Sequence, residues 1–260
     1  PEITEEDKAT AFWMNLGGAL IIYGLLWPLA PTIASFFEQP QLISLTRFMG
    51  LYLIFFALSL VQRAELSHRL DFKRLGLVTL GAAAAAGVIA VVLAFFGAGV
   101  WALAVKYVLL SAFTSLFLWA VNPWYPKQWI SRRSVRKLFG FGSKLALAGL
   151  LNEVFQNVYK VVIGKFFAAA TLGFYTQAQN FQRLASQSLV GMLQKVTYPV
   201  LAKANDDPAR LKRGYRTMIQ VSSYVIFPAM IGMALTAEPL ILTLVGESWR
   251  QTIPFLQLLC

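Results

Sequence analysis

Long apolar runs recur along this sequence and constrain its fold more than any other feature. We predict seven full spans and the start of an eighth, at roughly 10–37, 42–62, 75–96, 99–121, 140–167, 171–201, 214–236 and from 239 onward. About 20 apolar residues in a helix cross the hydrocarbon layer of a bilayer. Stretches such as 81–96 lack the alternation of apolar and polar residues that a membrane barrel needs. The pattern predicts an all-α, polytopic transmembrane protein.

Composition excludes a soluble fold. Of the 260 residues, 57% are hydrophobic and 13% are charged, and the mean hydropathy is +0.60. Soluble domains carry about a quarter charged residues. The single cysteine, Cys260, allows no internal disulfide. The chain starts at Pro1 without a signal-peptide pattern and stops inside an apolar run, so we expect a fragment truncated at both ends.

Basic residues are concentrated on every second connection between the spans. The segments 63–74, 122–144 and 203–216 hold 15 of the 23 lysines and arginines, whereas the alternate connections are short and nearly uncharged. The positive-inside rule therefore predicts that 63–74, 122–138 and 203–213 are cytoplasmic. The same distribution explains the net charge of +11 and argues against nucleic-acid binding.

The longest non-apolar stretch, 122–138, divides the sequence. It mixes prolines, tryptophans and basic residues, and the spans after it are less apolar than those before it. One interpretation is a linker between two helical bundles that lies on an anionic leaflet. The other is an ordinary cytoplasmic loop with interfacial tryptophans. We favour the linker, which predicts helical groups at 1–121 and 139–260.

Polar residues form a stripe on each of two successive spans. Their spacing of three and four places each set on one helix face, and ionisable groups inside a span cost ~2.5–3.5 kcal/mol each near its centre. The first stripe comprises Gly149, Glu153, Gln156, Asn157, Lys160 and Gly164; the second comprises Gln179, Arg183, Ser186, Gln194 and Thr197.

These stripes predict a water-filled cavity. The candidate substrate contacts are Glu153, Gln156, Asn157, Lys160, Gln179, Arg183, Lys106 and Lys195. A structural alternative remains, in which Glu153 pairs with a base as helix–helix glue and the lysines extend to the membrane surface. Bases outnumber acids in this set, so the cavity suits an anionic cargo such as a diphosphate.

Signatures of catalysis are missing from the sequence. His68, the one histidine, lies in a basic loop and is expected to be a surface residue. Asp206 and Asp207 precede a proline and are typical of a polar turn. No metalloprotease, Walker A or nucleophile-elbow motif occurs. We therefore predict no catalytic residue, no metal and no cofactor.

Several motifs resemble those of Wzx-type polysaccharide flippases, which share a superfamily with the MATE multidrug antiporters. The matching segments are Phe139–Lys144, Val162–Phe167, Leu172–Asn180, Tyr198–Ala202 and Ala237–Ile241. Upstream, Val61–Leu66 and Leu70–Arg74 resemble the lipopolysaccharide and colanic-acid branch.

The resemblance implies two helical lobes of a MATE-like flippase fold around a central cavity, in the bacterial inner membrane. Spans before 122 would be the last four helices of the N-lobe, and 139–260 would begin the C-lobe. It implies flipping of undecaprenyl-diphosphate-linked oligosaccharides by alternating access, with membrane lipids as partners and room for a coupling cation. The alternatives are a MATE-like small-molecule antiporter and a membrane-embedded polysaccharide polymerase, ligase or glycosyltransferase.

Overall fold

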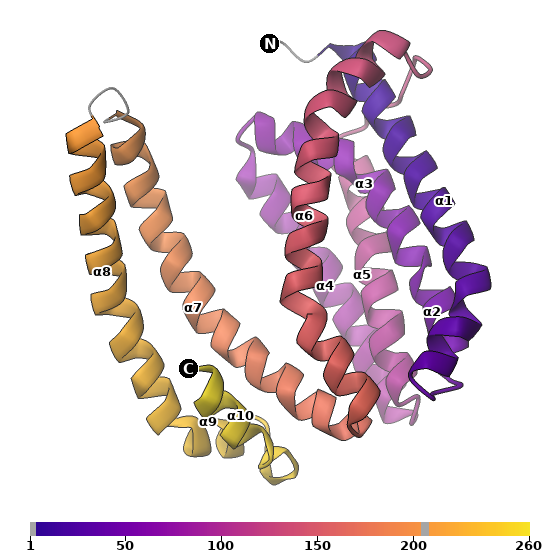
Figure 1. Cartoon of the computed structure of the whole chain (residues 1–260). Helices are drawn as coiled ribbons and strands as arrows, with labels where there is room; N and C mark the ends of the chain where they lie inside the picture. The colour runs from indigo at the N-terminus through magenta and orange to yellow at the C-terminus, as the bar shows by residue number, and fades with distance from the viewer. Residues whose placement is uncertain (1–3, 204–207) are drawn as a thin grey trace. The chain divides into compact units, whose positions relative to one another are not determined.

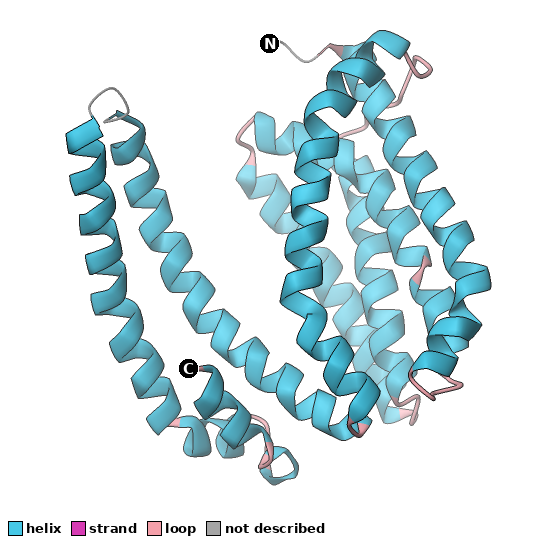
Figure 2. Ribbon diagram, in the orientation of Figure 1, coloured by secondary structure: helices cyan, strands magenta, loops and turns pink. Residues whose placement is uncertain are grey.

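All regular structure in the described residues is helical (Figures 1 and 2). The computed structural model describes the backbone of residues 4–203 and 208–260, with the side chains of these residues except Phe141 and those from 187 to 211. The chain forms two compact units, Pro1–Phe155 and Gln156–Cys260. The prediction of an all-α polytopic membrane protein is confirmed.

The first unit is a bundle of packed helices. α5 packs against α3 and α4, and α1 packs against α2 and α3. On α4, the residues Val78, Ala82, Ala86 and Ala90 recur every fourth position and are all buried. Small side chains at this spacing let helix backbones approach closely in a membrane. The helices are α1 (Glu5–Phe36), α2 (Leu42–Met49), α3 (Leu51–His68), α4 (Phe72–Phe95), α5 (Val100–Val121) and the first part of α6 (Arg132–Phe166).

A break at Gly50 separates α2 from α3 within one predicted span. A Cβ atom at Gly50 would lie 2.5 Å from Cδ2 of Tyr23, so the Tyr23 ring occupies the space that a side chain would need. Together Leu42–His68 is long and apolar enough to cross a membrane. The span at 42–62 is therefore confirmed as an apolar segment, but it consists of two helices.

Helix starts in the first unit follow local capping chemistry. The Thr4 hydroxyl accepts a hydrogen bond from the backbone N–H of Asp7 (3.2 Å), and the Asp7 carboxylate accepts one from the N–H of Thr4 (3.3 Å). This reciprocal capping box begins α1 five residues before the predicted start. At α4 the cap is a single bond, in which the Asp71 carboxylate accepts from the backbone N–H of Arg74 (3.1 Å).

The second unit contains longer helices and a small core. Ala178 of α7 packs with Ala237, Ile241 and Leu256 from the C-terminal segment. The apolar stretch from 239 onward contains a turn at Gly246 (φ 101°), which lies in the short connection predicted near 245–251. The elements are the rest of α6, α7 (Ala169–Lys203), α8 (Pro208–Leu235), α9 (Ala237–Leu244), the 3-10 helix η1 (Glu247–Trp249) and α10 (Thr252–Leu259).

Five helical segments within the described residues are long and apolar enough to cross a membrane, or six if α6, bent by 43° at residue 141, is counted. They include α1, α4 and α5 whole, and large apolar side chains on them, such as Ile21, Leu80 and Phe95, are exposed. A bilayer would cover such side chains. The described part of α7 is too rich in amide side chains to count as a membrane span, so its role as a span stays a prediction. The grouping of the helices into two lobes also stays a prediction.

Candidate functional site

The first polar stripe lies along α6. Glu153 and Gln156 are exposed, whereas Asn157 and Lys160 are half-buried. The Lys160 ammonium donates a hydrogen bond to Oδ1 of Asn157 (3.1 Å), three residues earlier on the same face. This bond holds one cation of the stripe at a defined position on the helix.

The second stripe lies on α7 and meets the first in one contact. The Arg183 guanidinium donates from Nη2 to Oε1 of Gln156 (2.9 Å), joining the two helices through predicted site residues. Gln179 is buried, and its Oε1 has no hydrogen-bond partner among the described residues. Lys195, with Gln194 and Thr197, lies outside the described side chains.

Lys106 belongs to the first unit, on α5. Its side chain is half-buried, and its ammonium lies 5.9 Å from the ring centroid of Tyr107. This separation is near the limit for a cation–π contact. The inclusion of Lys106 in a cavity, like that of the stripe residues, stays a prediction.

A hollow of about 470 Å³ lies at the start of α6. Four basic residues line it: Arg132, Arg133, Arg136 and Lys137. We call this hollow, with its four lining residues, the basic hollow. They are part of the basic stretch that the sequence predicts to be cytoplasmic, and none of them is a predicted cavity residue.

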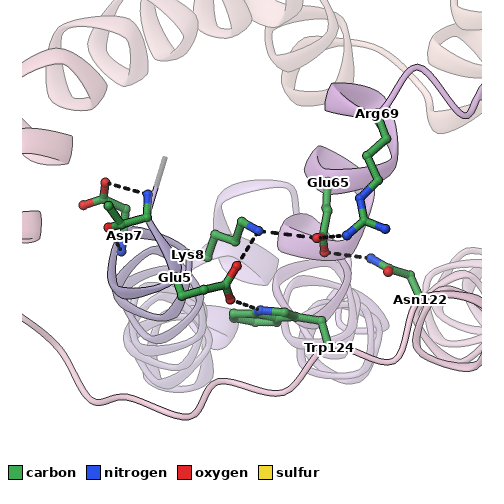
Figure 3. A network of polar contacts seen from close by, with 8 residues as sticks. Glu5, Asp7, Lys8, Glu65, Arg69, Asn122 and Trp124 are labelled. Atoms are coloured by element: carbon green, nitrogen blue, oxygen red, sulfur yellow. Dashed lines mark hydrogen bonds and ion pairs between the residues drawn. The ribbon is translucent and has the colours of Figure 1, made fainter. Parts of the chain in front are cut away.

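A polar network that sequence reasoning missed surrounds the start of α1 (Figure 3). Its centre is Glu65 near the end of α3, whose side chain is 8% exposed. The Glu65 carboxylate accepts hydrogen bonds from Arg69 (2.6 Å), Asn122 (2.9 Å) and Lys8 (3.4 Å). These donors come from α3, the segment after α5, and α1, so a single carboxylate joins three parts of the first unit.

The network continues along the first turn of α1. Lys8 also pairs with Glu5 (2.7 Å), whose other oxygen accepts from the indole N–H of Trp124 (2.7 Å). Asp7, with a 5% exposed side chain, forms an ion pair with Lys137 of α6 (2.6 Å). We call Glu5, Asp7, Lys8, Glu65, Arg69, Asn122, Trp124 and Lys137 the polar network.

Aromatic and backbone contacts attach the 122–138 stretch to α1 at the same place. The Trp13 indole stacks on Trp129 with ring centroids 5.1 Å apart, and it donates to the carbonyl of Gln128 (3.2 Å). The backbone N–H of Ser131 donates to the hydroxyl of Thr10 (3.2 Å). The stretch is therefore held against α1 by bonds along its length rather than extended away from the helices.

One sequence signal pointed toward this network. The acidic run Glu5–Asp7 precedes an apolar span, in a chain whose loops are strongly basic. The long-range partners of this run are Trp124 and Lys137, which are 119 and 130 positions away along the chain, so only the fold brings them together. No group of three or more metal-ligating side chains occurs in the part of the chain that the structure describes.

The sequence of nearly the whole chain, residues 1–254, matches the family model described as polysaccharide biosynthesis protein. The chain belongs to this family. This match confirms the resemblance to polysaccharide flippases that was predicted from the sequence. Because the chain also has several helices long and apolar enough to span a membrane, it is a multi-pass protein of the bacterial inner membrane.

Three curated relatives extend the comparison. The teichuronic acid biosynthesis protein TuaB of Bacillus subtilis is 24% identical over 99% of this chain and 54% of its own length. The lipopolysaccharide biosynthesis protein WzxC of Escherichia coli is 26% identical over 100% of this chain and 53% of its own. The succinoglycan biosynthesis transport protein ExoT of Rhizobium meliloti is 26% identical over 98% and 51%.

This family member thus spans about half the length of the curated relatives it matches. No solved structure matches it significantly. The relatives share names in polysaccharide biosynthesis, and one is named as a transport protein.

Proposed function

We propose that the protein flips undecaprenyl-diphosphate-linked oligosaccharides across the inner membrane for surface polysaccharide biosynthesis, by alternating access. The observation that carries the proposal is the Arg183–Gln156 bond, which joins the two polar stripes on α6 and α7. Family membership and the names of WzxC and ExoT support the same conclusion. Those names do not favour a drug antiporter.

The proposed mechanism is electrostatic and has no covalent step, so the protein is a transporter rather than an enzyme. A diphosphate carries negative charge through an apolar layer, where an uncompensated charge is costly. Lys160 and Arg183 are cations on the polar stripes of α6 and α7, and each is hydrogen-bonded to an amide that positions it. Arg183 would grip a phosphate through its planar fork and Lys160 as a point charge. A coupling cation, if the cycle uses one, would meet Glu153, the acid of the stripes.

The experiment is complementation of a flippase-deficient strain with the intact protein carrying Lys160→Ala and Arg183→Ala together. We expect surface polysaccharide to fall strongly at normal protein levels, and Arg183→Lys alone to restore part of it. The matched control is Lys73→Ala with Arg74→Ala, which removes one lysine and one arginine from outside the stripes. Wild-type polymer from the double variant would leave Lys160 and Arg183 as helix–helix contacts and end the proposal.

Orientation is part of the same proposal: the 63–74, 122–138 and 203–213 stretches face the cytoplasm, where a lipid-linked cargo would load. Thiol labelling of the intact protein in whole cells, with Cys260 replaced by Ser, tests it. A cysteine at the exposed position Lys127 should be protected from an impermeant reagent, and one at Ala98 should react. The reverse pattern would contradict the orientation without touching the choice of cargo.

A further inference from the structure

The basic hollow presents three arginines without acidic partners. Arg132, Arg133 and Arg136 are exposed, and in the described part of the chain none of their guanidinium groups forms an ion pair with a carboxylate. Lys137, the fourth lining residue, is paired with Asp7. The hollow therefore holds a local excess of positive charge with its strongest hydrogen-bond donors unused.

The acids of the polar network are already engaged by other donors. Asp7 is bonded to Lys137, Glu65 to Lys8, Arg69 and Asn122, and Glu5 to Lys8 and Trp124. A guanidinium gains most from a planar oxyanion that accepts two hydrogen bonds. These three carboxylates are occupied, and Glu6, the remaining acid of the first turn of α1, forms no ion pair with the arginines in the described structure. The arginines are therefore open to an anion from outside the chain.

The helix that carries the arginines is fixed in place. One side of its first turn is docked onto α1, through the bond from Ser131 to Thr10, the buried Ser134 and the ion pair of Lys137. The arginines lie at the intervening positions, on the outward side. A site built on a docked helix holds its donors in position before a ligand arrives, which reduces the entropy lost on binding.

The surroundings match the headgroup region of a membrane. Trp129 is 78% exposed, Tyr125 is 64% exposed and Ile130 is 53% exposed, all in the segment that leads into the hollow. Tryptophan and tyrosine prefer the membrane–water interface, and arginines beside them lie at the depth of lipid phosphates. A soluble anion would have no use for these exposed aromatic and aliphatic groups.

We propose that the basic hollow is a binding site for the phosphate of an anionic glycerophospholipid of the cytoplasmic leaflet. The arginines bind the phosphate oxygens, and Trp129 and Ile130 contact the glycerol and upper acyl region. This site is separate from the polar stripes and goes beyond the proposed transport function. It anchors the 122–138 stretch to the membrane surface while the polar network anchors it to α1.

The chain offers a matched control. Lys212, Arg213 and Arg216 have the same spacing as Arg132, Arg133 and Arg136, are likewise exposed, and also lie near the start of a helix. Replacing either triple by glutamine removes the same charge from a predicted cytoplasmic loop. General attraction to an anionic surface would respond equally to both changes, whereas a site in the hollow responds to one.

Native mass spectrometry of the intact protein titrated with phosphatidylglycerol tests the proposal. We expect Arg132→Gln, Arg133→Gln and Arg136→Gln together to weaken the tightest phosphatidylglycerol binding by about tenfold or more, and the control triple to change it less than about threefold. Equal losses in both triples, or no loss in the first, would overturn the site. Displacement of phosphatidylglycerol by an equimolar polyprenyl diphosphate would reassign it to the transported lipid and overturn the phospholipid assignment.

A second variant covers the case in which lost charge disturbs membrane insertion. The triple Arg132→Lys, Arg133→Lys and Arg136→Lys keeps every charge and hence the orientation. It lacks the forked donors, so we expect binding weakened by about threefold or more. Wild-type affinity in this lysine triple would overturn the assignment of phosphate contacts to the arginines.

Discussion

The polar network at the start of α1 and the polar stripes of α6 and α7 use similar residues in different ways. In the network, Glu65 and Asp7 have side chains that are 8% and 5% exposed, and each is bonded to a cation from another element. On the stripes, Glu153 is exposed and Arg183 is half-buried against the amide of Gln156. Acids compensate the bases of the network, whereas bases predominate on the stripes.

This difference separates structural charge from charge that a cargo can use. A buried carboxylate surrounded by donors cannot lose them without a large penalty, so it fixes the elements that supply them. An arginine held by one neutral amide keeps donors for a ligand and loses little when that amide is exchanged. We expect substitutions in the network to change stability and substitutions in the stripes to change transport.

The largest effect on stability is expected from Glu65→Ala. It leaves the Asn122 amide without its acceptor and removes one of the two carboxylate partners of the partly buried Lys8. The cost should be roughly 2–4 kcal/mol, between the loss of one charged hydrogen bond and the breaking of a buried ion pair. Thermal unfolding of the intact protein in detergent measures it. Glu153→Ala is the matched substitution on the polar stripe, and it should shift the unfolding midpoint little. Equal shifts in the two variants would contradict the difference between the polar network and the polar stripes.

Two glycines give a matched test of packing. Gly50→Ala forces a Cβ to within 2.5 Å of the Tyr23 ring and should cost roughly 1–3 kcal/mol. Gly149→Ala on α6 meets nothing within 4 Å and should be neutral or stabilise the helix by up to about 1 kcal/mol. Tyr23→Ala should relieve part of the Gly50→Ala defect. If Gly149→Ala destabilises the protein more than Gly50→Ala, the first unit does not pack as described.

A smaller loss is expected from Trp124→Phe. The variant keeps the edge contact with Phe12 but loses the hydrogen bond to Glu5, at roughly 0.5–1 kcal/mol. Trp101→Phe is the control, because Trp101 packs on Phe48 and its indole N–H has no hydrogen bond in the described structure. If the two variants have the same unfolding midpoint, the Trp124–Glu5 bond adds nothing to the stability of the protein.

The smallest change in stability is expected from Arg183→Ala, about 0.6 kcal/mol, which is typical of a hydrogen bond between membrane helices. The same substitution should reduce polysaccharide export far more than Glu65→Asp, a network substitution that keeps the charge. Unfolding midpoint and polymer level, measured on the same preparations, separate the two effects. A large stability loss in Arg183→Ala would move this arginine from the class of cargo contacts to that of structural bonds.

The helices of this protein were predictable because each depends on a local pattern. Apolar runs of about 20 residues specify spans wherever they occur, so α1, α4 and α5 were found within a few residues of their bounds. The division at Gly50 was missed because a glycine inside an apolar run is ambiguous until the Tyr23 ring is known to lie beside it. The turn at Gly246 was predictable as part of a short connection near 245–251, because polar residues and a glycine interrupt the apolar pattern there.

The network was beyond prediction, because its geometry depends on contacts over long separations. Lys8 and Glu65 are 57 residues apart, and Asp7 and Lys137 are 130 apart. Periodicity places Gln156 and Arg183 on predicted stripes, and the structure joins them. Whether those stripes line a cavity depends on what surrounds them, which a periodic pattern does not specify.

The indole rings near the polar network make this end of the protein observable without labels. Four of the seven tryptophans are Trp13, Trp119, Trp124 and Trp129, and the contacts among them and Phe12 form a continuous aromatic cluster. Indole emission changes with solvent exposure and with the proximity of other rings. The intrinsic fluorescence of these four indoles therefore reports on whether the stretch after α5 stays on α1, and it would record any opening of that contact in real time.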